Sequence, residues 1–113
     1  MTYDEVISAI DTVRPNTAAL PAKRAWITVL ESKIHNHMTS FSECDVKISP
    51  DKLLLGNEYL DMYVYYAVSM IDLENQDIAM YNNSCSFFNE MFEAWQKKRR
   101  RENLPIARRK GGE

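Results

Sequence analysis

Residues 59–95 read YLDMYVYYAVSMIDLENQDIAMYNNSCSFFNEMFEAW, and this stretch decides the fold. Its second half repeats apolar residues at spacings of three and four, the period of one face of an α-helix. The residues on that face are Ile78, Tyr81, Cys85, Phe88, Phe92 and Trp95. The first half is apolar around nearly its whole circumference, which indicates a helix buried on several sides. The stretch therefore predicts two long amphipathic helices.

The wide apolar surface of the first of these helices has two explanations. One is a well-packed central helix within a single chain. The other is burial against a second subunit, for which Tyr and Met offer large and adaptable contact surfaces. The mid-helix run of Asn82, Asn83 and Ser84 suits side-chain hydrogen bonding across an interface, although two of these residues facing solvent would explain it as well. The candidate subunit-interface residues are Tyr59, Tyr63, Tyr65, Tyr66, Met70, Asn82 and Asn83.

Two further helices are expected nearer the N-terminus. Thr2 and Glu5 fit a capping box at the start of a first helix, which Pro15 ends. Pro21 suits the first turn of a second helix, where its missing N–H is not needed. The inner face of the second helix is predicted to hold Trp26, Ile27, Leu30, Ile34 and Met38.

The other segments complete the predicted architecture. Residues 39–57 lose helical periodicity and predict an extended loop, with a short strand at 46–48 as the alternative. The two long helices are expected at roughly 58–75 and 77–101, with Asp77 as the N-cap of the second. We therefore predict an all-α bundle of about four helices, with an extended loop between helices 2 and 3 and an extended C-terminal tail.

The formal net charge of −2 hides an uneven distribution. Residues 97–113 hold eight Lys or Arg and two Asp or Glu, a formal charge of +6. Residues 1–96 hold six Lys or Arg and fourteen Asp or Glu, a formal charge of −8. The chain is thus an acidic body with a basic extension. We divide it into a helical domain, residues 1–98, and a basic C-terminal extension, residues 99–113.

No group of residues has a spacing suited to catalysis or to metal binding. His35 and His37 are two residues apart and point to different sides of a helix. Cys44 and Cys85 have no ligand spacing, and the motifs of phosphate-binding loops and hydrolases are missing from the sequence. We therefore expect no catalytic residues, no metal, no cofactor and no enzyme activity. The apolar runs are also shorter than the ~20 residues that cross a bilayer, and no signal pattern opens the chain, so no membrane partner is expected.

Three short motifs in residues 59–95 resemble a known family. They are Tyr63-Val64-Tyr65-Tyr66, then Ile71-Asp72, then Tyr81-Asn82-Asn83-Ser84 followed by Phe88-Asn89. This pattern is similar to that of head–tail connector (adaptor) proteins of long-tailed bacteriophages and prophages. The resemblance covers about a third of the chain strongly. Family members usually carry a proline before the first long helix, where this chain has Gly56-Asn57-Glu58, and this departure bears on the local turn.

The resemblance implies a structural virion protein at the neck, made in the bacterial host cytoplasm. It implies a homo-oligomeric ring of about twelve copies under the portal protein. Such a ring extends the DNA channel and forms the platform for the next neck or tail-completion protein. Genomic DNA would pass through it without sequence-specific binding.

The basic extension has three explanations. In the first, which we favour, it docks on the portal. The second is a nucleic-acid-binding tail on a small helical regulator, since clustered Lys and Arg release counterions from phosphates; the chain lacks a convincing helix-turn-helix for this function. The third is a solvated end. The predicted portal-docking residues are Arg99, Arg100, Arg101, Leu104, Pro105, Ile106, Arg108 and Arg109.

Overall fold

The computed structural model describes residues 1–39, 47–49 and 51–102. In this part of the chain there are four α-helices and one short 3-10 helix: α1 (Tyr3–Val13), α2 (Leu20–Thr39), η1 (Asn57–Tyr59), α3 (Leu60–Glu74) and α4 (Ile78–Glu102). The predicted all-α fold is therefore confirmed. Lys47 and Ile48 are not in a strand, so the predicted loop is correct for these two residues. The predicted tail from residue 103 onward lies outside the described residues.

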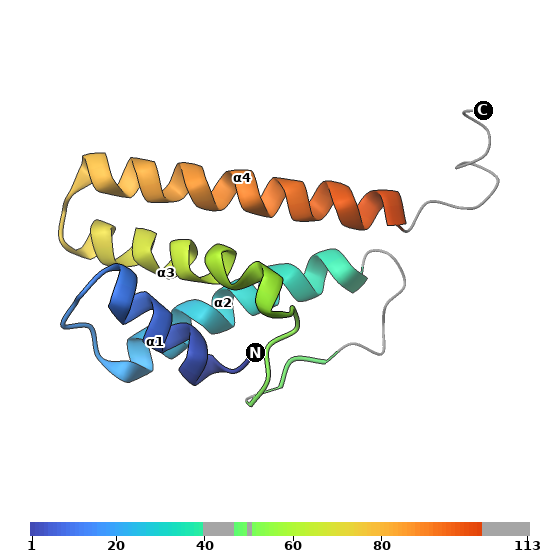
Figure 1. Cartoon of the computed structure of the whole chain (residues 1–113), viewed down its shortest axis with the longest axis horizontal. Coiled ribbons are helices and arrows are strands. Elements are labelled where there is room, and N and C mark those ends of the chain that lie inside the picture. The colour runs from blue at the N-terminus through green and yellow to red at the C-terminus, as the bar shows by residue number, and fades with distance from the viewer. Residues whose placement is uncertain (40–46, 50, 103–113) are drawn as a thin grey trace.

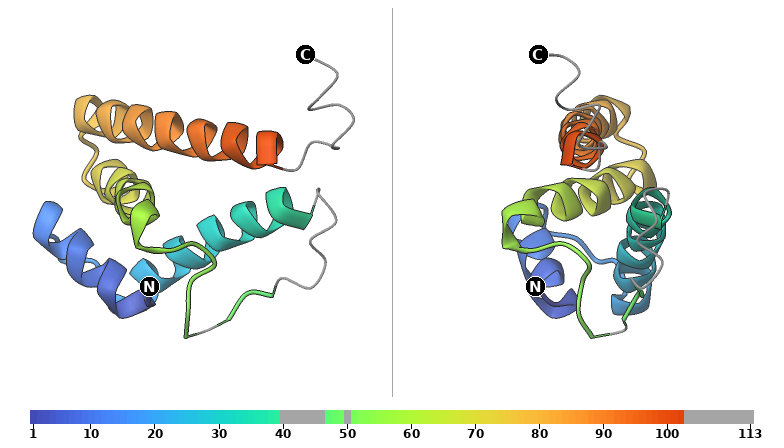
Figure 2. Two further views of the ribbon diagram at one scale, coloured as in Figure 1. Left: turned by 45° about the vertical axis from the view of Figure 1, so that its right-hand side comes forward. Right: turned by 90° about the vertical axis from the view of Figure 1, so that its right-hand side faces the viewer.

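Helix α3 lies at the centre of a three-layer arrangement, with α4 on one side and the pair α1 and α2 on the other (Figure 1). The same three layers can be followed in the two rotated views (Figure 2). Met62, Tyr63 and Val64 are consecutive, and each is at most 2% exposed. Since consecutive helical residues point in different directions, α3 is covered on several sides by its own chain. Packing within one chain therefore explains the wide apolar surface of this helix.

The helix starts follow the predicted capping pattern. The backbone N–H of Glu5 donates to Thr2 Oγ1 over 3.2 Å, and the backbone N–H of Thr2 donates to the carboxylate of Glu5 over 3.2 Å. This is the capping box expected for α1. Asp77 caps α4, because its carboxylate accepts from the backbone N–H of Met80 over 3.1 Å. Both predicted caps are confirmed.

A Schellman motif closes the turn between α3 and α4. The N–H of Asp77 donates to the carbonyl of Asp72, and the N–H of Gln76 donates to the carbonyl of Leu73, both over 3.0 Å. This geometry needs a left-handed residue, and Gln76 supplies it with φ of 57°. Glycine is usual at this position because a side chain strains the left-handed conformation.

We expect Gln76→Gly to stabilise the protein by about 0.5 kcal/mol, because relief of the left-handed strain exceeds the added entropy of the unfolded chain. Asn75→Gly is the matched control, since Asn75 has ordinary helical torsions (φ −78°) and gains nothing from glycine. Urea denaturation of both variants gives the comparison. Stabilisation by both changes, or by neither, would contradict this account of the turn.

The inner face of α4 differs in part from the predicted one. Phe88 and Trp95 are buried as expected, at 8% and 2% exposure. Ile78 is 59% exposed, so its predicted place on the inner face is wrong. It lies at the end of the hairpin, where α3 has already ended and cannot cover it (Figure 1). Ser84 takes a buried position that the sequence pattern did not assign to it.

Helix α4 continues to Glu102, so the boundary predicted at residue 98 falls inside it. Arg99, Arg100 and Arg101 form its last turn and not the start of an extension. Lys and Arg are good helix formers, and cations at a helix C-terminus interact favourably with the helix dipole. The first part of the basic segment is therefore held on a rigid helix.

Candidate functional site: an open hairpin flank and a basic helix end

The family-like motifs lie on the facing sides of the α3–α4 hairpin. The hydroxyl of Ser84 donates to the buried carboxylate of Asp72 over 2.7 Å. The rings of Tyr66 and Phe88 pack edge to face with their centroids 5.0 Å apart. Ser84, Asp72, Tyr66 and Phe88 of the motifs therefore make contacts that join the two helices.

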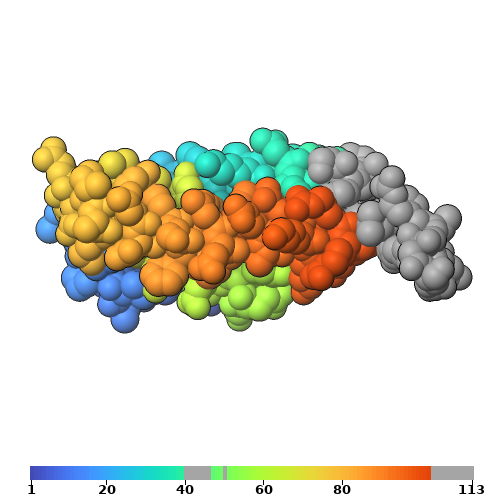
Figure 3. Space-filling model, turned by 90° about the horizontal axis from the view of Figure 1, so that it is seen from above, coloured from blue at the N-terminus to red at the C-terminus, as the bar shows by residue number. Residues whose placement is uncertain are grey.

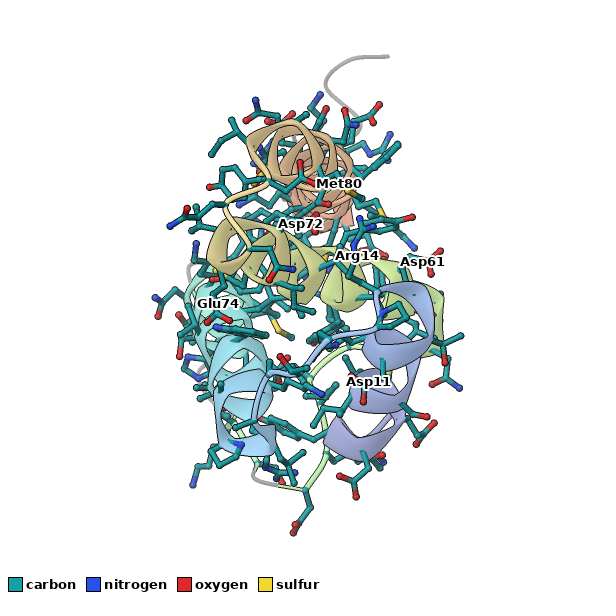
Figure 4. All side chains as sticks on the ribbon, turned by 90° about the vertical axis from the view of Figure 1, so that its left-hand side faces the viewer. Asp11, Arg14, Asp61, Asp72, Glu74 and Met80 are labelled. Carbon is teal, nitrogen blue, oxygen red and sulfur yellow. The ribbon has the colours of Figure 1, made fainter. Side chains whose placement is uncertain are left out.

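Arg14, the residue that follows α1, ties the other layer to this hairpin. Its Nε lies 3.1 Å from Asp72 Oδ1, and its Nη1 lies 3.8 Å from the sulfur of Met80. Figure 4 shows Arg14 beside Asp72 and Met80, where α1, α3 and α4 meet. Asp72, on α3, thus binds Arg14 at the end of α1 and Ser84 on α4, which is a structural arrangement. Asp72 itself is buried.

The candidate interface residues fall into two groups. Tyr63 and Tyr66 are 1% and 8% exposed, so their surface is already used inside their own chain. Tyr59, Tyr65 and Met70 are half-buried, whereas Asn82 and Asn83 are exposed. Only the second group offers surface to a partner, and the candidate interface becomes correspondingly narrower.

One flank of the hairpin carries exposed aromatic surface. Phe87 is 52% exposed, and its ring packs against that of Tyr65 with centroids 5.3 Å apart. Met91 and Ala94 follow Phe87 by four and seven residues, so they continue the same face of α4. Seen from above, α2 runs along one side of α4, and the first turns of α3 lie along the other (Figure 3). We call the Tyr65, Phe87, Met91 and Ala94 surface the open flank.

An apolar pocket of about 260 Å³ lies at the C-terminal end of the open flank. It forms where α4 passes η1 and the start of α3. Lys98 and Glu58 are its charged residues, and the rest of the lining is apolar or aromatic. The lining residues are Glu58, Tyr59, Met62, Met91, Ala94, Trp95 and Lys98.

A basic hollow adjoins this pocket on the last turns of α4. Its lining residues are Ala94, Lys97, Arg100 and Arg101, so Ala94 borders both depressions. Residues 97–101 are five consecutive bases, and we call them the basic end of α4. Of the predicted docking residues it contains Arg99, which is half-buried, and the exposed Arg100 and Arg101. The other predicted docking residues, Leu104, Pro105, Ile106, Arg108 and Arg109, lie outside the described residues.

The most deeply buried ionisable pair lies away from both depressions. Tyr63 donates its hydroxyl to the carboxylate of Glu31, which also accepts from the backbone N–H of Leu54 over 2.9 Å. Burial raises the pKa of Glu31, although both hydrogen bonds oppose the shift. Burial and the neighbouring Glu31 together raise the pKa of Tyr63 as well. The pair joins α2, the loop and α3, and it is closed to substrates because Glu31 is 0% exposed.

His37, one of the two histidines, makes a packing contact. His37 packs its ring on Trp95, with centroids 5.0 Å apart. Among residues 1–39, 47–49 and 51–102, no three His, Cys, Asp or Glu side chains form a group able to hold a metal ion. No described helix is both long enough and apolar enough to cross a bilayer.

Comparison with known proteins adds no relative. No family model, curated protein or solved structure matches this chain. The arrangement of the described residues therefore carries the functional inference.

The open flank, the pocket and the basic end of α4 adjoin one another and form one continuous surface. Aromatic and Met side chains supply contact area, and the cations add attraction for an acidic partner. Sequence reasoning found Tyr59, Tyr65 and the three arginines of this surface but missed Phe87, Met91 and Ala94. A signal for them was present, because these residues repeat at a spacing of four and three on α4.

Proposed function

We propose that the protein is a structural assembly subunit, a head–tail connector of a long-tailed bacteriophage or prophage. In this function, copies form a ring of about twelve beneath the portal protein. The ring extends the DNA channel and provides the platform for the next neck or tail-completion protein.

The observation that carries the proposal is the basic end of α4. Five consecutive cations stand on the last turns of a 25-residue helix, on a body whose first 96 residues have a formal charge of −8. A rigid, directional cation cluster beside an apolar pocket suits docking to a specific protein surface. The resemblance of residues 59–95 to connector proteins selects the portal as that surface.

We assign the three arginines at the basic end of α4, Arg99, Arg100 and Arg101, to the portal. The open flank, the apolar pocket and Lys97 are assigned to contacts between copies. The acidic body would repel DNA phosphates and let the genome slide through the channel. The rival function, a DNA-binding regulator, rests on the same cations, but the sequence lacks a convincing helix-turn-helix for it.

Replacing Arg99, Arg100 and Arg101 together by alanine is expected to reduce capture of the portal protein at least tenfold in a pull-down. This corresponds to about 1.4 kcal/mol or more, a modest loss for three interfacial charges. The fold should persist, since Arg100 and Arg101 are exposed and alanine favours the helix. The portal used is the one encoded in the same genome.

The matched control removes three cations elsewhere, by Lys33→Ala, Lys47→Ala and Lys52→Ala. This control changes the net charge equally and should leave capture intact. Equal capture by the arginine variant and the wild-type protein would refute the docking assignment. Salt-sensitive binding of the wild type to DNA, without capture of the portal, would favour the regulator.

A further inference from the structure

The turn between α3 and α4 presents apolar side chains to solvent. Leu73 is 45% exposed and Ile78 is 59% exposed, although both are large aliphatic residues. Glu74 and Asp77, which lie between them in sequence, are exposed as well. We call residues 73–78 the hairpin tip. It is an apolar projection that also carries two carboxylates.

The opposite end of α4 carries surfaces of complementary character. The apolar pocket adjoins the basic hollow, and Ala94 is the shared wall between them. Figure 1 shows the hairpin tip and the basic end of α4 at opposite ends of the hairpin. A single chain therefore cannot bring its own tip to its own pocket.

We propose that the hairpin tip of one copy docks into the apolar pocket of the next copy, with its carboxylates at the Lys97 edge of the basic hollow. Leu73 and Ile78 cover the apolar lining, and Glu74 faces Lys97 in the basic hollow. The inference deepens the proposed function by naming the contact between copies, and it rests on the part of that function in which copies assemble.

The hairpin tip and the surface it docks on are complementary in charge and in apolar character. The pocket lining contains one carboxylate, Glu58, whereas the pocket and hollow together present four cations, so the local field attracts an acidic tip. Burying the two aliphatic side chains removes apolar area from water on both copies. A second copy is the occupant that supplies both features at once.

The two surfaces differ from each other, so the contact is heterologous. Repeated contacts of this kind close into a ring when the rotation between copies permits it, and otherwise extend as a filament. The contact is thus of the type that a ring of identical connector subunits requires.

The test is sedimentation velocity of the full-length chain at rising concentration, with two variants. The tip variant carries Leu73→Ser and Ile78→Ser, and the pocket variant carries Ala94→Glu. All three positions are exposed, so the helices should form as in the wild type. The wild type is expected to form larger assemblies, and each variant alone is expected to remain monomeric.

Mixing the two variants gives the decisive result. The mixture retains one intact tip, on the pocket variant, and one intact pocket, on the tip variant. It should therefore form one-to-one dimers and nothing larger. A wild type that stays monomeric, a tip variant that assembles fully, or a mixture without dimers would each overturn the proposal.

Three further variants serve as controls. Val29→Ser changes an exposed aliphatic residue on α2 and should assemble like the wild type. Glu74→Lys should weaken assembly, and mixing it with Lys97→Glu should restore part of it through the exchanged charges.

Portal capture is measured separately: capture by a protein that does not self-associate overturns this inference alone, whereas self-association without capture overturns the portal assignment.

Discussion

Trp95→Ala is expected to destabilise the protein by about 3–5 kcal/mol, the usual cost of truncating a large buried aromatic residue. Trp95 is 2% exposed, and its ring lies 5.0 Å from that of His37 and 5.7 Å from that of Phe92. It therefore joins the C-terminal half of α4 to the end of α2. Because it also forms a wall of the apolar pocket, the same change should enlarge that pocket.

Urea denaturation measures the loss, and Phe87→Ala is the matched control. Phe87 is also an aromatic residue of α4, but it is 52% exposed, so its truncation should cost only about 1 kcal/mol or less. Similar losses for the two variants would show that α4 does not pack on the bundle through the face described here.

Glu31→Ala is expected to destabilise the protein by about 3 kcal/mol. The change leaves the Tyr63 hydroxyl and the Leu54 N–H without their acceptor, in a region where water cannot replace it. Each buried group left unsatisfied costs about 1–3 kcal/mol, and relief of the buried charge offsets part of the sum. Glu5→Ala is the control for a surface carboxylate, since it loses only the capping box, at about 1 kcal/mol. Equal losses for the two variants in urea denaturation would contradict the role given to Glu31.

We also expect the stability of the folded protein to depend on pH through Glu31. Burial raises its pKa in the folded state above the ordinary value of 4.5, so the folded protein holds this proton more tightly than the unfolded chain. Stability contributed by this group is therefore present at low pH and decreases as the pH rises through the raised pKa. Glu31→Gln carries no titrating group and should remove that decrease. Urea midpoints from about pH 4 to about pH 8 give the comparison, and an unchanged slope in the variant would contradict this assignment.

The helices themselves follow from local signals in the sequence. The capping box at Thr2, the stop at Pro15 and the N-cap at Asp77 all act within a few residues, so they can be recognised without tertiary structure. The burial of α3 on several sides was also predictable, because a helix apolar on nearly all sides needs several neighbours. Whether these neighbours belong to the same chain or to a second subunit was left open by the sequence.

The partners of particular side chains were not predictable in the same way. Ser84 looks like a solvent-facing polar residue until Asp72, twelve positions earlier, is placed opposite it. The pairing of Glu31 with Tyr63 joins residues 32 positions apart and has no periodic signal. Tyr63 and Tyr66 suit an interface by residue type, and only their burial in their own chain shows that their surface is unavailable.

The basic end of α4 and the apolar pocket differ in how far the sequence predicts them. The cluster of bases is visible in the sequence, and the helix predicted at roughly 77–101 already included it, as α4 confirms by reaching Glu102. The pocket beside it depends on the crossing of α4 over η1 and α3, and such a crossing is set by the packing of the whole bundle.

Electron microscopy of the purified portal, with and without the full-length chain, tests the central claim most directly. The account predicts an added ring of density on one end of the portal, with the rotational symmetry of the portal, and loss of this ring for the variant with alanine at Arg99, Arg100 and Arg101. Portal particles that look the same with and without the chain would contradict the connector function.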